Sequence, residues 1–384
     1  MPNKTREFFK EKKLWSVYKD KILGNYLKPY FQKMSISSNS TIYIDGFAGK
    51  GVFDDGSKGS PLIVKDILVN IQKSSTNKKK KIFPAFIENK YANELESNLN
   101  DKNFKVFNSD YKTKVNEILH KNINKYNIFL YVDPFGIKDI DFNIFKLLAS
   151  NNKSSELLLN LNSFGFIREG CRNLKVAIDE DIEVSAGDYE ESSGNDIQNM
   201  NKIANGSEWQ QIVSEIGKTI NGKKAERLFV QLYLKKLGEI FRYVFAVPIR
   251  TRDTLVPKYQ IIFATNHHHG AFIMLDTMLK CDVEMTRNGQ NGQMSLFDYE
   301  NTKSNINTEI LSLLDRDKWI NCRDLCFKLF NKYKIYFIKD VRAAIKELEK
   351  EGKIIVDRHN KTTKTGQQSL ALDFVKSDIN LKRN

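Results

Sequence analysis

The sequence has 384 residues, of which 41% are hydrophobic and 28% charged, and this length suits one large globular domain with a small one. It contains no apolar run long enough for a transmembrane helix, and residues 1–13 are charged without the apolar core of a signal peptide, so we expect a cytoplasmic protein. The four cysteines form no Cys-x-x-Cys pair and have no histidine at ligand spacing, which argues against disulfides and against a metal site.

The net charge of +14 is unevenly distributed. Lys and Arg exceed Asp and Glu mainly in residues 1–40 and 301–384, and the chain between them is nearly neutral. Two basic flanks suit a polyanion such as nucleic acid, because Lys and Arg near phosphates release condensed counterions. A general bias toward lysine for solubility is the alternative.

Residues 1–40 carry aromatic side chains at helical spacing, among them Trp15, Tyr18, Tyr26 and Tyr30. The pattern predicts an amphipathic helix that packs on the sheet of the following domain. Aromatic side chains at this spacing more often pack into a core than line a nucleic-acid binding surface.

Residues 41–51 are an apolar strand that ends in an acid and continues into a glycine-rich loop. The glycines allow a sharp turn and let a ligand lie against main chain, whose amides face its polar end. The spacing differs from the dinucleotide fingerprint and resembles motif I of the class I methyltransferases that use S-adenosylmethionine. This resemblance implies that Asp45 attracts the cationic methionine end and that the loop surrounds it; a turn without ligand is the alternative. The predicted cofactor residues here are Asp45, Gly46, Phe47, Gly49 and Gly51.

Three further apolar runs end in an acid: Glu88 follows 82–87, Asp110 follows 104–107 and Asp133 follows 128–132. Helical patterns separate these runs, so we expect parallel strands whose carboxyl ends meet at one edge of a sheet. In the methyltransferase fold, an acid at the first of these positions accepts hydrogen bonds from ribose hydroxyls, and one at the second contacts the adenine amino group. Glu88 and Asp110 take these two roles by resemblance.

Asp133, Pro134 and Phe135, followed by Gly136, resemble the Asp-Pro-Pro-Tyr motif of enzymes that methylate base amino groups. In that motif the acid and a proline-fixed carbonyl accept hydrogen bonds from the target amine, and an aromatic ring stacks on the extruded base. We therefore take these three residues as the candidate catalytic group. The chain departs from the motif in having one proline and a glycine in the last place, and an ordinary tight turn is the alternative.

The remainder of the first domain, 41–285, is expected to hold a helical insertion near 165–240 and a closing pair of strands, 243–248 and 258–265. The acidic segment 179–200 is poor in large apolar groups, so we interpret it as a mobile insertion. The predicted fold is α/β, a Rossmann-like class I methyltransferase fold with a mostly parallel seven-stranded sheet.

After a linker at 286–305, residues 306–376 show three helical patterns, a short strand and a polar hairpin, which resembles a winged helix. In that fold the third helix enters the major groove and the hairpin touches the backbone, although protein-binding winged helices are also common. The candidate nucleic-acid contacts are Lys339, Arg342 and Lys346 on the third helix, and Arg358, Lys361 and Lys364 on the hairpin.

Five blocks taken together resemble the three-Cys-motif partner proteins over roughly residues 15–300. They are Asp45–Gly51, Gly59–Leu62, Phe86–Glu88, Asp133–Gly136 and Ile262–His267. This family is bacterial, is regarded as methyltransferase-like and is named for a genomic neighbour that carries three cysteines. The resemblance implies a partner protein of radical-SAM-like type.

The hypothesis from sequence is a methyltransferase-like protein that binds S-adenosylmethionine and acts on DNA or RNA, with a base amino group as candidate acceptor and a partner protein. A non-catalytic nucleic-acid recognition subunit with a degenerate site is the second hypothesis. A small-molecule methyltransferase is the third, and it predicts no salt-dependent binding of polyanions.

Overall fold

The computed structural model describes residues 10–74, 81–178, 196–249, 257, 259–289, 306–333, 336–359 and 378–384. The chain divides into two compact units, residues 1–267 and 268–384. Within the described ranges, no helix is both long enough and apolar enough to cross a membrane.

The first unit is built around a seven-stranded sheet with the order β3-β2-β1-β4-β5-β7-β6. The strands are β1 (Thr41–Asp45), β2 (Ile82–Ile87), β3 (Lys105–Phe107), β4 (Asn127–Val132), β5 (Ser155–Leu161), β6 (Tyr243–Ile249) and β7 (Tyr259–Thr265). β7 is antiparallel to both neighbours, and the other pairs are parallel. This order and the reversed β7 define the Rossmann-like methyltransferase fold that the sequence predicted.

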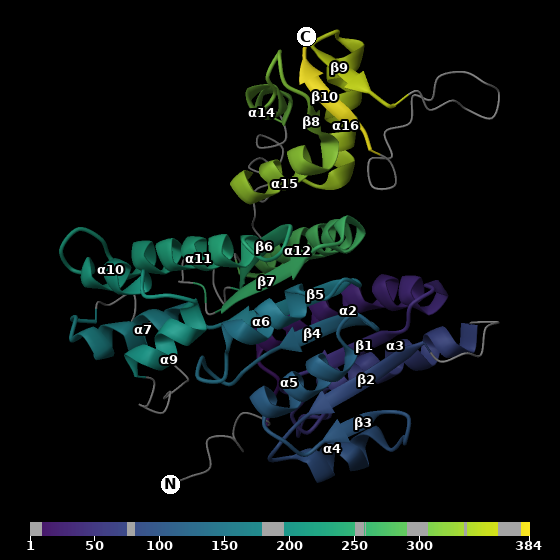
Figure 1. The fold of residues 1–384 in the computed structure, drawn as a ribbon, viewed down its shortest axis with the longest axis vertical. Coiled ribbons are helices and arrows are strands. Elements are labelled where there is room, and N and C mark those ends of the chain that lie inside the picture. Colours follow the sequence, from purple (N-terminus) through teal and green to yellow (C-terminus); the bar gives the residue numbers. More distant parts are fainter. Residues whose placement is uncertain are drawn as a thin grey trace. The chain divides into compact units, whose positions relative to one another are not determined.

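Helices cover both faces of this sheet (Figure 1). They are α2 (Leu14–Ile36), α3 (Ser60–Ser74), α4 (Ala92–Leu99), α5 (Tyr111–Asn122), α6 (Phe142–Ala149), α7 (Ser163–Leu174), α9 (Ile197–Ala204), α10 (Trp209–Ser214) and α11 (Gly222–Gly238). The last four form the helical insertion expected near 165–240, and most of the acidic segment, residues 179–195, lies outside the described ranges.

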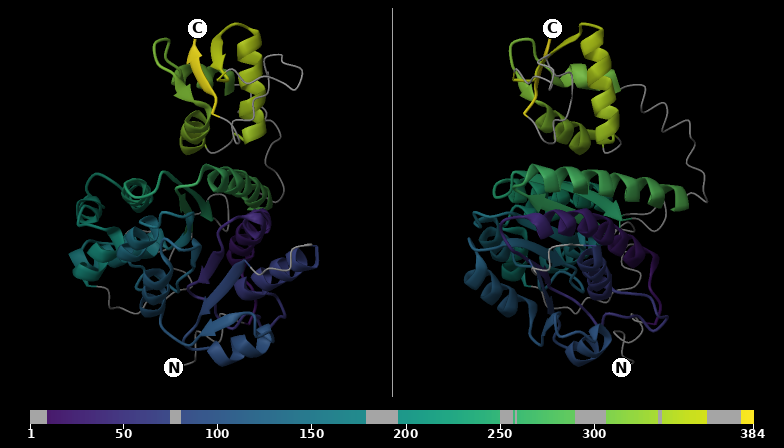
Figure 2. Two further views of the ribbon diagram at one scale, coloured as in Figure 1. Left: turned by 45° about the vertical axis from the view of Figure 1, so that its right-hand side comes forward. Right: turned by 90° about the vertical axis from the view of Figure 1, so that its right-hand side faces the viewer.

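The two faces of the sheet differ because successive strand residues point to opposite sides. Ile44, Leu130 and Leu159 point to a hydrophobic core that they share with α5, α6, α7 and α11. Tyr43 and Phe129 point the other way, and their rings stack at 5.7 Å. Phe31 of α2 meets Tyr43 edge-on at 5.8 Å, so α2 covers this aromatic face with the stripe seen in the sequence. Figure 2 shows the first unit from two further directions.

The register places the carboxyl ends of the central strands side by side. Asp45, the last residue of β1, pairs with Phe86 of β2 on one side and Tyr131 of β4 on the other. Glu88 and Asp133 each follow their pairing residue by two positions, so they emerge at one edge of the sheet next to the loop after β1.

The second unit contains α12 (His268–Gly289), α14 (Ile306–Leu313), α15 (Cys322–Tyr333), α16 (Ile338–Lys350) and a three-stranded antiparallel sheet. The strands are β8 (Ile320–Asn321), β9 (Ile354–Asp357) and β10 (Asn380–Arg383), in the order β8-β10-β9.

The unit boundary differs from the one drawn at residue 285. α12 belongs to the second unit, because the Phe272 ring packs on Phe327 at 5.0 Å and Asp276 accepts a hydrogen bond from the Ile338 amide at 3.4 Å. The second unit also extends past the predicted domain end at 376, because β10 lies at 380–383. Residues 290–305 of the linker and 360–377 of the hairpin lie outside the described ranges.

Candidate functional site

The loop after β1 turns back on itself through two glycines with left-handed backbone, Gly49 (φ 63°) and Gly51 (φ 81°). The Gly59 amide donates to the Gly51 carbonyl at 2.8 Å and closes the turn. A Cβ on Gly51 would lie 2.8 Å from Leu62 and 2.9 Å from Leu95, so this position needs glycine for space as well as for conformation.

A cavity of about 260 Å³ opens between this loop, the ends of β2 and β4, and α2. The lining includes seven of the predicted residues: Phe47, Gly49, Gly51, Glu88, Asp133, Pro134 and Phe135. The structure thus brings together residues from three separate strand ends, as expected for a ligand site at the carboxyl edge of a parallel sheet.

Glu88 joins β2 to the glycine loop. One carboxylate oxygen accepts from the Gly49 amide at 2.9 Å, and the other accepts from the amides of Lys90 and Tyr91 at 2.7 and 3.1 Å. Each carboxylate oxygen has two acceptor positions. The oxygen bonded to Gly49 therefore keeps one position for a ligand hydroxyl.

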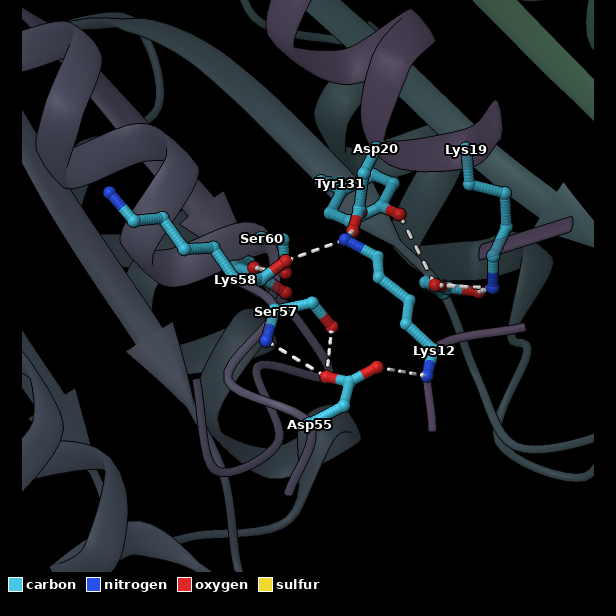
Figure 3. A network of polar contacts seen from close by, with 10 residues as sticks. Lys12, Lys19, Asp20, Asp55, Ser57, Lys58, Ser60 and Tyr131 are labelled. Atoms are coloured by element: carbon cyan, nitrogen blue, oxygen red, sulfur yellow. Dashed lines mark hydrogen bonds and ion pairs between the residues drawn. The ribbon is translucent and has the colours of Figure 1, made fainter. Parts of the chain in front are cut away.

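Asp133 is held from three directions, and Figure 3 labels two of its donors, Lys19 and Tyr131. The Lys19 ammonium of α2 donates to both its oxygens at 2.8 and 2.7 Å. Asn160 of β5 donates to Oδ1 at 2.7 Å, and the Tyr131 hydroxyl donates to Oδ2 at 3.2 Å. All four acceptor positions of the carboxylate are occupied. A substrate amine reaches Asp133 only by displacing one of these donors.

Three predicted cofactor residues do not line the cavity. Asp45 is fully buried behind the loop, where it accepts from Ser60 Oγ at 2.7 Å and from the Phe47 amide at 3.2 Å. Burial raises the pKa of Asp45 to about 7. Gly46 is buried too, and a Cβ there would meet the Tyr111 ring at 2.6 Å.

Asp110 is the third such residue. It is exposed and caps α5 by accepting from the Thr113 amide at 2.9 Å, a bond that lowers the pKa of Asp110. In this arrangement Asp45 and Gly46 shape the loop and Asp110 starts α5, and their contacts with a cofactor stay a prediction.

Eleven lining residues were not predicted, among them Ser16, Lys19, Asp20 and Tyr259. The first three lie on α2, which was assigned to core packing. Lys19 lies 5.2 Å from the centre of the Tyr259 ring, so the helix and β7 meet over the cavity. A signal was present in the sequence, because Ser16, Lys19 and Asp20 are polar residues at positions i, i+3 and i+4 of an otherwise aromatic helix.

Lys12 precedes α2 and ties it to the loop after β1. Its ammonium pairs with Asp20 and donates to the Lys58 carbonyl at 2.6 Å, and its amide donates to Asp55 at 3.0 Å (Figure 3). Burial raises the pKa of Asp20 to about 6, although Lys12 and Lys19 act to lower it.

In the second unit, the candidate nucleic-acid residues divide into three groups. Lys339 and Lys346 are exposed on α16, and Arg342 on the same helix is half-buried. Arg358 is buried, with its guanidinium bonded to both oxygens of Glu349 at 2.6 and 2.5 Å, so it holds β9 to α16 and is not presented to a phosphate. Lys361 and Lys364 lie outside the described residues.

Neither a protein-family model nor a curated protein sequence matches the chain. Among solved structures, a DUF519 protein of Legionella pneumophila is similar at 12% identity with a TM-score of 0.40, covering 72% of this chain and 93% of its own. The plantazolicin methyltransferase BamL, in complex with a triazolic desmethylPZN analogue and SAH, is similar at 12% identity with a TM-score of 0.32, covering 68% and 90%. Similarities of this size assign no family to the chain.

Proposed function

We propose that the cavity binds S-adenosylmethionine and that the protein transfers the methyl group to a nucleic acid. The observation that carries the proposal is one cavity lined by the glycine loop, Glu88 and Asp133, in a sheet of methyltransferase order. When bound, the cofactor supplies a methyl group on a sulfonium; an acceptor lone pair attacks that carbon, and the thioether leaves.

The residues present fit such a ligand. Glu88 has an acceptor position left for a ribose hydroxyl, and its other bonds fix the Gly49 amide of the glycine loop and the amides of Lys90 and Tyr91 after β2. The Ser16 hydroxyl is buried in the cavity wall and has no hydrogen-bond partner among the described residues, as expected where a ligand atom completes the bonding. The protein contributes mainly by aligning donor and acceptor.

Phe135 supports a base as acceptor. Its side chain is 57% exposed although it lines the cavity beside Asp133, and an exposed ring in this place can stack on an extruded base. Asp133 would then orient the base amino group once Lys19 gives up one of its two bonds. We propose a base amine as the acceptor on these grounds.

The second unit is proposed as the winged-helix module that binds the nucleic acid. Lys339 and Lys346 are seven residues apart on α16 and therefore share one exposed face of the helix. Both are exposed, so they are available to meet phosphates. A partner protein of the three-Cys-motif type, radical-SAM-like in chemistry, is proposed from the sequence resemblance alone.

Calorimetry with S-adenosylmethionine tests the cofactor, and incubation with methyl-labelled cofactor and mixed DNA and RNA tests the transfer. We expect binding by the isolated chain and label in nucleic acid. Absence of binding would refute the cofactor site. Binding to nucleic acid that does not weaken between two salt concentrations would refute the polyanion substrate.

A second function, a non-catalytic recognition subunit, is favoured by one observation: every acceptor position of Asp133 is occupied within the chain. This function predicts cofactor and nucleic-acid binding without transfer. Label transferred by the isolated protein would rule it out, and label transferred only when the three-Cys-motif neighbour is added would support it.

A further inference from the structure

The start of α2 forms a polar patch in an otherwise aromatic helix. Lys12, Ser16 and Asp20 follow one another at intervals of four residues and so lie on one side of the helix and its lead-in. Ser16 and Asp20 line the cavity, and the Lys12–Asp20 ion pair is nearly closed to solvent, with side chains 10% and 13% exposed. A hydroxyl and an anion thus line one cavity wall, and the cation Lys12, outside the lining itself, is paired with that anion.

This patch matches a zwitterion. An α-amino acid group carries an ammonium beside a carboxylate, and it needs an anion for the first and donors for the second. The Lys12–Asp20 pair satisfies itself when the cavity is empty. The free Ser16 hydroxyl is the feature that the pair does not explain, since a buried hydroxyl is normally bonded.

We infer that α2 supplies the subsite for the amino-acid end of the cofactor, with Asp20 binding its ammonium and with Lys12 and Ser16 binding its carboxylate. The inference rests on the proposed function. It also explains how a cationic methionine end is held although Asp45 lies behind the loop: Asp20 is the carboxylate on the cavity side.

Lys12 links this subsite to the glycine loop. Its amide bonds Asp55 and its ammonium bonds the Lys58 carbonyl, so the loop that would surround the ligand and the helix that would bind its amino-acid end are joined by one residue. A ligand that reaches across the cavity would therefore contact both the glycine loop and α2, the two elements that Lys12 joins.

Two ligands separate the subsite from the rest of the cavity. S-adenosylhomocysteine has the amino-acid end, and 5′-methylthioadenosine has the same thioadenosine without it. Calorimetry on the full chain compares both ligands for the native protein, Asp20→Asn, Lys12→Met and the control Glu117→Gln. Glu117 is an exposed acid of α5 paired with Lys114 and Lys121, away from the cavity.

We expect Asp20→Asn to weaken the affinity for S-adenosylhomocysteine at least tenfold and to change the affinity for 5′-methylthioadenosine by less than twofold. Lys12→Met should act in the same direction, and Glu117→Gln should change neither affinity. Equal losses for both ligands would give Asp20 a merely structural role and overturn the inference. Equal affinity of the native chain for the two ligands would overturn it as well and would leave the adenosine site standing. Failure of the native chain to bind either would remove the proposed function together with the inference.

Discussion

The cavity has two walls that differ in how they are built. The loop wall consists of residues 47–60 with Glu88, and it is made largely of main chain turned by glycines and fixed by one carboxylate. The helix wall consists of Ser16, Lys19 and Asp20 of α2, and its two charged side chains pair with Asp133 and with Lys12, which precedes the helix. Main chain gives shape and side chains give charge. The two walls are therefore expected to bind different parts of a ligand.

The largest expected effect tests how the helix wall is attached to the sheet. Lys19→Met removes the cation from a pair whose side chains are 8% and 21% exposed, leaving Asp133 without its main partner. We expect a loss of about 2 to 3 kcal/mol in the free energy of unfolding, since an uncompensated, largely buried charge is costly. Urea unfolding followed by circular dichroism measures it.

The matched control is Lys121→Met. Lys121 also pairs with a carboxylate, Glu117, but its side chain is 70% exposed, so its removal should cost less than about 1 kcal/mol. Equal losses for the two variants would mean that Lys19 does not fix α2 to the strand edge.

Glu88→Ala tests the loop wall. The carboxylate fixes the Gly49 amide of the loop and two amides after β2, and it keeps one acceptor position for a ribose hydroxyl. Its loss should therefore weaken the binding of S-adenosylhomocysteine roughly 100-fold, or about 2.7 kcal/mol. Because the ribose is common to both ligands, 5′-methylthioadenosine should weaken equally, in contrast to the effect of Asp20→Asn. Calorimetry measures both, with the exposed Glu94→Ala on α4 as control. A selective loss of one ligand would contradict the division between the walls.

The loop wall was largely visible in the sequence and the helix wall was not, for a physical reason. A strand that ends in an acid before glycines fixes its own local geometry, and parallel strands bring such ends to one edge, so Glu88 and Asp133 could be placed together. Asp20 comes to the same cavity only because α2 crosses the sheet at a particular angle. That angle is set by aromatic packing on Tyr43 and Phe129, which no local pattern encodes.

The same limit explains the three residues that lie away from the lining. An acid at a strand end can point into a cavity, behind a loop or toward a helix start, and the sequence does not choose among them. Asp45 finds Ser60 and the Phe47 amide behind the loop, and Asp110 finds the Thr113 amide at the start of α5. Each is satisfied locally, and Asp110 is the N-cap of α5, a position where Asp is preferred.

The packing of the loop wall can be tested with two glycines that have the same backbone φ angle. Gly51 and Gly56 both have φ 81°, but a Cβ on Gly51 meets Leu62 and Leu95 whereas one on Gly56 meets nothing within 4 Å. Gly56→Ala should cost about 1 kcal/mol for the left-handed conformation alone. Gly51→Ala should cost a further 1 to 2 kcal/mol for overpacking. Unfolding titrations compare the losses in free energy of unfolding for the two variants. Equal losses would show that the loop accommodates a Cβ at Gly51 and is not tightly packed there.

The smallest effect concerns pH and the helix wall. Because burial raises the pKa of Asp20 to about 6, the empty site binds a proton below that pH, and an ammonium ligand must displace it. The affinity for S-adenosylhomocysteine should fall by up to about tenfold per pH unit below pH 6, while that for 5′-methylthioadenosine should not share this fall. The other charged groups facing Asp20 are Lys12, Lys19, Asp133 and Asp45.

Burial raises the pKa of Asp45 to about 7, and its protonation behind the loop would change the affinity for both ligands alike. The difference between the two ligands therefore isolates Asp20. In Asp20→Asn this difference should become independent of pH, because the variant has no proton for the ligand ammonium to displace. If the affinity difference between the two ligands still decreases below pH 6 in the variant, another group titrates. Asp20 would then not be the anion that binds the ligand ammonium.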